Sequence, residues 1–156
     1  MKEGKQKLTR SNPKGRIAAV SISRDKGTKK TNVPEIILKE NFGIMGDAHA
    51  GTGNRQVSLL AEESIEKIKA KGIQVKAGDF AENITTQGLD LLGLDIGTKL
   101  KIGLDVILEL TQKGKECHTR CSIYYQAGDC VMPKEGVFAK VVKGGNVKPG
   151  DEIIVY

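Results

Sequence analysis

Three cysteines are the residues with the clearest chemical potential in this chain. Cys117, Cys121 and Cys130 are its only cysteines, and they lie within one short stretch of the 156 residues. Clustered thiols in an intracellular protein indicate metal ligands or reactive sulfur more often than a structural disulfide. Lys113 and Lys115 come just before Cys117, and nearby cations favour the thiolate form of a cysteine. We therefore predict that Cys117 is the reactive thiol.

The same stretch allows two other interpretations. The spacing Cys-x3-Cys-x8-Cys, with His118 beside the first cysteine, resembles a metal site. It lacks the Cys-x2-Cys pairs of common zinc motifs. Cys121 and Cys130 could instead be small buried apolar residues.

A second group of polar residues lies in a glycine-rich segment. Asp47 and His49 stand between Gly46 and Gly51, and Arg55 follows. An Asp and a His two residues apart can point into one cleft, and such a loop lets backbone N–H groups approach an anion. We expect Asp47 to orient His49 through a ring N–H, and His49 to assist proton transfer. In the alternative interpretation, Asp47 only caps its own turn.

A third polar segment runs from residue 78 to residue 86. Glu82, Asn83 and Thr85 could form the polar wall of a pocket, with Phe80 as an apolar plug beside it. An ordinary capped loop is the other interpretation of this segment.

Composition and charge exclude several classes of protein. No apolar run approaches the ~18 residues of a membrane span, and the first residues carry no apolar secretory signal. These features predict a cytoplasmic protein without a membrane partner. Six aromatic residues and no Trp argue against a stacking surface for nucleic acid. Residues 1–30 hold ten Lys or Arg and two acids, which indicates a basic, frayed N-terminal arm.

The elements that must position these residues are mostly short strands. Glycine and proline break the chain into alternating or apolar runs, and a single amphipathic stretch, 61–71, predicts a helix that ends at Gly72. A second short helix could cover 118–126. Many short strands with few helices predict a β-barrel with helical inserts. The predicted strands are 16–23, 33–38, 55–60, 98–102, 105–111, 137–143 and 152–156.

Several separated motifs together resemble the MOSC domain, the module named after the C-terminal domain of molybdenum cofactor sulfurases. The resemblance covers about Ile17 to Tyr156 and is closest to short, standalone bacterial members. It follows the order of these segments: Gly46-Asp47-x-His49-x-Gly51, Arg55 to Leu59, Gly78-Asp79-Phe80-x-Glu82-Asn83-Ile84, Gly88 to Asp90, Leu100-x-Ile102-Gly103, Cys117, Gly136 to Phe138, and Gly145 with Gly150-Asp151.

The resemblance implies a mostly β, MOSC-type barrel, similar to the pyruvate-kinase β-barrel, over 16–156, after an arm at 1–15. It implies a cleft that binds the molybdenum cofactor (molybdopterin) or a sulfur acceptor, with Cys117 carrying sulfur as a persulfide or ligating molybdenum. The partners would be the cofactor or proteins that donate or accept sulfur. The family is sometimes described as binding pyridoxal phosphate, but no lysine for that cofactor can be identified in this sequence. The expected cofactor contacts are Arg55, Gly46, Gly51, Glu82, Asn83, Lys113 and Lys115.

Three functions remain open from the sequence. The first is cofactor binding or sulfur carriage in molybdenum cofactor metabolism. The second is a small molybdenum-dependent reductase of N-hydroxylated compounds. The third is a non-catalytic zinc or iron–sulfur module that uses Cys117, Cys121, Cys130 and His118. Under the first two, we expect Asp47, His49 and Arg55 to line the same cleft as Cys117, since strand ends gather at one rim of a barrel.

Overall fold

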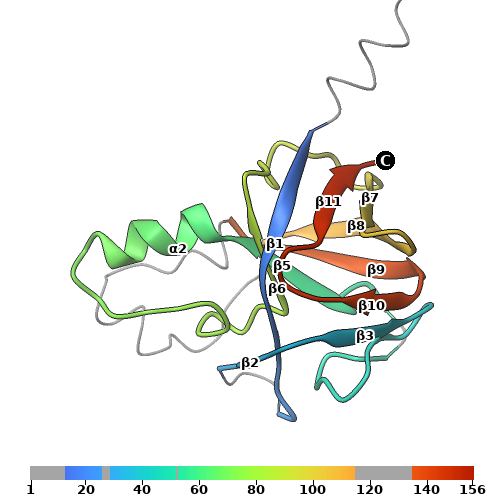
Figure 1. The fold of residues 1–156 in the computed structure, drawn as a ribbon, viewed down its shortest axis with the longest axis horizontal. Coiled ribbons are helices and arrows are strands. Elements are labelled where there is room, and N and C mark those ends of the chain that lie inside the picture. The colour runs from blue at the N-terminus through green and yellow to red at the C-terminus, as the bar shows by residue number, and fades with distance from the viewer. Residues whose placement is uncertain (1–12, 26–28, 52, 115–134) are drawn as a thin grey trace, which may run out of the picture.

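A closed β-barrel forms the body of the molecule (Figure 1). The computed structural model describes residues 13–25, 29–51, 53–114 and 135–156. Seven strands follow one another around the barrel in the order β11-β7-β8-β9-β5-β6-β1, and β1 pairs with β11 to close it. Their bounds are β1 Lys14–Ile22, β5 Val57–Ala61, β6 Ile84–Gln87, β7 Lys99–Ile102, β8 Val106–Lys113, β9 Val137–Lys143 and β11 Glu152–Val155. The predicted mostly β barrel is therefore confirmed.

Alternating apolar residues fill the barrel. In β8 every second side chain is buried, among them Val106, Leu108 and Leu110. This is the pattern of a strand with one face toward a core. The neighbouring strands contribute residues such as Leu59 and Leu100, which are completely buried. The strand pairs of the barrel are antiparallel except β5 and β6, which run parallel.

A small second sheet packs against strands β8 and β9 of the barrel. It has the order β10-β3-β4, with β10 at Gly145–Val147, β3 at Ile36–Lys39 and β4 at Gly43–Ile44. The remaining strand, β2 at Thr31–Val33, pairs with the end of β1. Ile36 and Leu38 of β3 are buried in the main core. This sheet therefore fixes the glycine-rich segment that follows β4.

One helix projects to the side of the barrel in Figure 1. This helix, α2, spans Glu62–Lys69, inside the predicted range. Its buried Ile65 and Ile68 pack with Leu60, Phe80 and Phe138 in a second, smaller core. Glu62 and Glu63 lie in the first turn and Lys67 and Lys69 in the last, which suits the helix dipole. Within the described residues, no helix is long and apolar enough to cross a membrane.

The structure differs from the predicted elements at several points. The predicted strand 33–38 is divided into β2 and β3 around Pro34, because proline cannot donate to a strand ladder. Strands β4, β6 and β10 were not predicted. β1 already begins at Lys14, which pairs with Ile154, so strand pairing starts inside the range expected for the arm. The predicted helix 118–126 lies outside the described residues.

Candidate functional site

A buried lysine lies at the centre of a polar cluster. Lys30 donates from Nζ to Asp47 Oδ1 at 2.9 Å and to Ser23 Oγ at 3.1 Å. Its third polar neighbour is His49 Nδ1, 3.2 Å from Nζ. The Lys30 and Asp47 side chains are both 0% exposed. An ammonium and a carboxylate are kept in the interior only when they are paired and hydrogen-bonded. Lys30 and Asp47 meet this condition through each other.

Asp47 is held as a carboxylate by this cluster. Oδ1 accepts the Ser23 N–H at 3.1 Å as well as the Lys30 ammonium, and Oδ2 accepts the His49 backbone N–H at 3.0 Å. Burial by itself raises the pKa of Asp47, but the nearby His49 side chain, the Lys30 ammonium and the backbone N–H groups of His49 and Ser23 outweigh burial and hold the pKa well below its ordinary value. Asp47 is therefore ionised at neutral pH.

The ring of His49 makes a different contact from the one predicted. The Asp47 Oδ2 to His49 Nδ1 separation is 3.7 Å, too long for a hydrogen bond. The ring nitrogen instead faces Lys30. Asp47 takes the backbone N–H of His49 because a carboxylate two residues earlier reaches that group most directly. The His49 side chain is 20% exposed, so part of its ring is open to a ligand.

Lys30 also joins two glycine motifs that are far apart in the sequence. Its backbone N–H donates to the Gly78 carbonyl at 2.8 Å. A Cβ at Gly78 would lie 2.4 Å from the Lys30 carbonyl oxygen, and Gly78 has a φ of +93°. Only glycine fits this close, left-handed position. The motif that begins at Gly46 and the motif that begins at Gly78 therefore meet at a residue that belongs to neither.

Glu82 and Asn83 hold the second motif from inside. Both are 0% exposed. Glu82 accepts the Gly78 N–H at 2.8 Å, the Phe80 N–H at 3.2 Å and the Thr85 hydroxyl at 2.9 Å. Burial raises the pKa of the Glu82 carboxyl, and these hydrogen bonds oppose the rise.

Asn83 ties the same loop to two strands. Its Oδ1 accepts the Ser58 N–H at 3.0 Å, and its Nδ2 donates to the Ser21 carbonyl at 3.1 Å. Because the chain itself occupies these polar atoms, we assign Glu82 and Asn83 to the support of the loop. The cofactor contact expected for them stays a prediction.

Arg55 lies where β8 leads toward the cysteine segment. Its guanidinium lies over the Phe138 ring, 5.2 Å from the centroid, and its Nε donates to Gln112 Oε1 at 3.1 Å. Gln112 in turn donates to the Gly114 carbonyl at 2.9 Å. The arginine is exposed, and none of the described residues bonds to its two terminal nitrogens. A bidentate edge is thus open toward a ligand.

The glycine-rich segment and the Arg55 segment lie side by side. A Cβ at Gly43 would lie 2.8 Å from the Gln56 carbonyl oxygen and 3.3 Å from the Ala50 Cα. Gly43 therefore packs closely against the backbone of both segments, the one that contains Asp47 and His49 and the one that contains Arg55. These are the segments that we expect to share a cleft. Gly46 and Gly51 both have positive φ; a Cβ at Gly51 would meet nothing within 4 Å.

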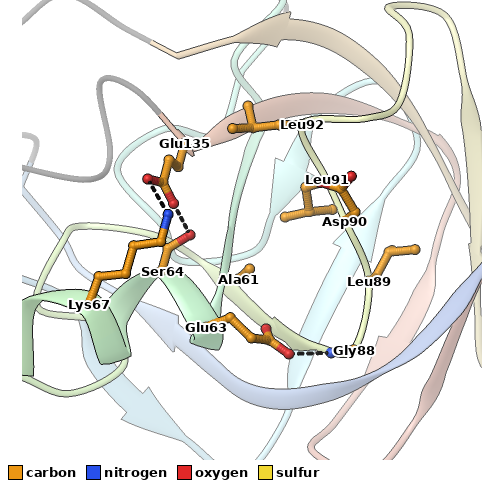
Figure 2. A pocket seen from close by; sticks show the side chains of 10 residues that line it. All are labelled: Ala61, Glu63, Ser64, Lys67, Gly88, Leu89, Asp90, Leu91, Leu92 and Glu135. Atoms are coloured by element: carbon orange, nitrogen blue, oxygen red, sulfur yellow. Dashed lines mark hydrogen bonds and ion pairs between the residues drawn. The ribbon is translucent and has the colours of Figure 1, made fainter. Parts of the chain in front are cut away.

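A cavity of about 460 Å³ opens beside α2 (Figure 2). Glu135 reaches across it to Lys67 Nζ at 2.9 Å and to the Ser64 hydroxyl at 2.5 Å, and Glu63 accepts the Gly88 N–H at 2.8 Å. Lys113 Nζ donates to the carbonyl of Leu92, one of the cavity's apolar lining residues, at 3.0 Å. Residues just before and just after the cysteine segment thus both contact the cavity's lining. The remaining lining residues are Ala61, Leu89, Asp90 and Leu91.

The cysteine segment lies outside the described residues. Lys115, Cys117, His118, Cys121 and Cys130 all lie outside the described residues. The expected proximity of Cys117 to His49 therefore stays a prediction. In the described ranges, no group of three or more His, Cys, Asp or Glu side chains could hold a metal ion.

Sequence reasoning missed Lys30. It stands in the basic N-terminal stretch, where a lysine is normally solvated, and no local pattern marks it as buried. The one available signal is its place three residues before the start of the predicted strand at 33–38.

Comparisons with known proteins agree with this architecture. A model of the MOSC domain family matches residues 46–154. The structure resembles the YUAD protein from Bacillus subtilis with a TM-score of 0.79 and 17% identity, covering 94% of this chain and 98% of that one. It also resembles YiiM from Geobacillus stearothermophilus, with a TM-score of 0.66 and 17% identity over 91% of this chain and 75% of that one.

A third similar structure is YiiM from Escherichia coli, with a TM-score of 0.62 and 19% identity over 90% of this chain and 69% of that one. At these identities the likeness concerns the fold alone. A search of curated proteins gives no significant match. Since the family model covers more than half of the sequence, the chain belongs to the MOSC domain family.

Proposed function

We propose that this MOSC protein binds the molybdenum cofactor or carries sulfur for a metal–sulfur centre, with Cys117 as its reacting residue. The observation that carries the proposal is the position of Arg55. Its guanidinium is fixed by Phe138 and Gln112 at the end of the strand from which the chain enters the cysteine segment. A cation fixed at this point suits an anionic ligand, and beside the Cys117 thiol it would favour the thiolate.

The residues that are described fit a phosphate-bearing pterin cofactor. The open edge of Arg55 can bind a phosphate in bidentate fashion, and the His49 ring is partly exposed in the neighbouring segment. Cys117 would supply the thiolate that a soft metal prefers. When bound, the cofactor would provide the molybdenum-centred chemistry, and Arg55 would orient its charged end.

For sulfur carriage the chain needs only the thiol. The Cys117 thiolate would attack the outer sulfur of a donor persulfide. The donor's S–S bond would break, and its electron pair would leave with the donor thiolate, so that the persulfide remains on Cys117. The cation at Arg55 would stabilise the negative sulfur.

Metal analysis of the purified protein tests the proposal most directly. Molybdenum, zinc and iron are measured in the same sample, for the wild type and for Cys117→Ser, with Cys130→Ser as the matched control. Molybdenum that is lost only in Cys117→Ser supports cofactor binding. Zinc or iron that is lost in both variants favours the metal module instead and overturns the proposal.

A metal-free protein calls for the sulfur assay. After incubation with a low-molecular-weight persulfide, mass spectrometry should find one added sulfur on the Cys117 peptide. A protein that holds no molybdenum and gains no sulfur at Cys117 contradicts the proposal in both forms.

Arg55→Ala tests the observation on which the proposal rests. The loss of a charge-assisted contact should weaken cofactor binding by about 10- to 100-fold. Lys99→Ala, which removes an exposed cation from β7, is the matched control and should leave the affinity unchanged. An equal affinity of Arg55→Ala and the wild type would remove Arg55 from the site.

A further inference from the structure

The number of donors and acceptors around Lys30 indicates which nitrogen of the His49 ring carries the proton. A lysine ammonium has three N–H donors and no acceptor. Its three neighbours are Asp47 Oδ1, Ser23 Oγ and His49 Nδ1, at 2.9, 3.1 and 3.2 Å. Each N–H therefore has one acceptor, and His49 Nδ1 must accept with its lone pair.

A neutral imidazole that accepts at one nitrogen carries its proton on the other. The proton of His49 therefore lies on Nε2, and no described residue takes that N–H. Asp47 does not compete for Nδ1, because its Oδ2 already accepts the His49 backbone N–H at 3.0 Å and stands 3.7 Å from the ring nitrogen. A protonated ring would place a second positive charge against the Lys30 ammonium.

We propose that Lys30 is a positioning residue that holds His49 as the neutral Nε2–H tautomer, so that the site offers its ligand a hydrogen-bond donor at this point instead of a base. The ligand atom beside His49 is then an acceptor, such as an oxygen of a phosphate or of an oxyanion of molybdenum. The ligand class rests on the proposed function, whereas the tautomer is a property of the ligand-free protein.

Other groups around the ring are consistent with this state. The charges that contact it in the described part of the chain are the Lys30 ammonium and the Asp47 carboxylate, and they neutralise one another at 2.9 Å. The Ser23 hydroxyl donates away from the cluster, to the Asp25 carbonyl at 3.0 Å, which leaves its oxygen free to accept from Lys30. The hydrogen bonds of this cluster are therefore all consistent with Lys30 as the donor to Asp47, Ser23 and His49.

Long-range ¹⁵N–¹H correlation spectra of ligand-free protein test the tautomer. The chain has two histidines, so the background variant His118→Asn leaves only the signals of His49. At neutral pH, Nδ1 should show the shift of an unprotonated nitrogen and Nε2 that of a protonated one. A protonated Nδ1 in this background overturns the proposal, whatever the other variants do.

Variants at residue 30 test the cause. In Lys30→Met the nearest partner of Nδ1 is the Asp47 carboxylate, and Nδ1 should acquire a proton. In Lys30→Arg a donor is kept, and Nδ1 should stay unprotonated. An unchanged Nδ1 in a folded Lys30→Met protein would show that Lys30 does not set the tautomer.

Titration with inorganic phosphate or molybdate tests the donor role. Either anion should shift the His49 Nε2–H signal in the His118→Asn background and have no such effect in Lys30→Met. An unaffected signal with both probes refutes the donor role. Because neither spectrum depends on Cys117, failure of this inference is distinguishable from failure of the proposed function.

Discussion

Replacing Lys30 by methionine removes the buried ammonium but keeps most of the side-chain volume. Asp47 then remains as a carboxylate with no cation in an environment where both side chains are 0% exposed. Breaking one partner of a buried pair costs about 3–5 kcal/mol of the free energy of unfolding. Asp47→Asn leaves the reverse problem, an unpaired ammonium, and should cost about as much.

The double variant Lys30→Met/Asp47→Asn separates pairing from packing. It carries no uncompensated charge, and the amide oxygen of asparagine can still accept one of the two backbone N–H groups. We expect it to be destabilised by only about 2–3 kcal/mol, because one N–H is left without an acceptor. The sum of the two single losses in the free energy of unfolding should therefore exceed the loss in the double variant by about 3 kcal/mol or more.

Urea unfolding gives the three free energies, provided that the slope with denaturant is the same for all variants. Lys140→Met is the control, since it breaks a partly exposed pair with Glu109 at 3.9 Å and should cost less than about 1 kcal/mol. If the effects of Lys30→Met and Asp47→Asn simply add to within about 0.5 kcal/mol, the two residues are not energetically coupled and the reasoning about the cluster is refuted.

The same pair gives a pH dependence of known sign. The fold lowers the pKa of Asp47, so the Asp47 carboxyl binds a proton less readily in the folded protein than in the unfolded chain. The resulting stabilisation is complete above the unfolded value of about 4 and is lost as the pH falls below it. The free energy of unfolding should therefore decline more steeply in acid for the wild type than for Lys30→Met/Asp47→Asn.

Three further predictions concern other parts of the fold. Gly78→Ala should lower the free energy of unfolding by more than about 1 kcal/mol, because its Cβ would lie 2.4 Å from the Lys30 carbonyl oxygen at a φ of +93°; a urea midpoint equal to that of the wild type would contradict this. Glu82→Gln should cost about 1–3 kcal/mol, since an amide group would turn one N–H toward a backbone donor; Glu82→Asp, which keeps the acceptors, serves as the comparison in the same measurement. Deletion of residues 1–12 should leave the thermal midpoint unchanged, because pairing of β1 starts at Lys14; a loss of several kcal/mol would show that the arm packs on the barrel.

Local patterns were sufficient to predict the barrel and its helix. The apolar residues of α2 recur at helical spacing and those of β8 alternate, so the elements could be placed to within a few residues. Strand β6 was missed because Thr85 was assigned to a polar pocket wall and Thr86 continues the same polar segment. Both are buried, since β6 lies between β1 and β5 in the sheet. This burial is decided by pairing with strands that are far away in the sequence, and no local pattern indicates it.

The sequence marked candidate residues for the site but not the contacts between them. Spacing placed Asp47 and His49 in one glycine-rich segment, whereas the partner of the ring, Lys30, comes from 19 positions earlier in the chain. A lysine in a basic stretch carries no mark of burial. The internal partners of Glu82 were unpredictable for a similar reason, because they come together only when the loop folds.

The closure of the barrel between β1 and β11 has a consequence for how the protein is made. Lys14 pairs with Ile154, and the Val155 N–H donates to the Pro13 carbonyl at 2.9 Å, so the seam joins segments from opposite ends of the sequence. A ribosome delivers β1 long before β11, and until then β1 has one open edge. Contacts of such high sequence separation form slowly, and an unpaired edge invites association with other chains. Newly synthesised protein should therefore pass through a state in which the sheet is still open, and a chain cut before Glu152 should aggregate instead of folding.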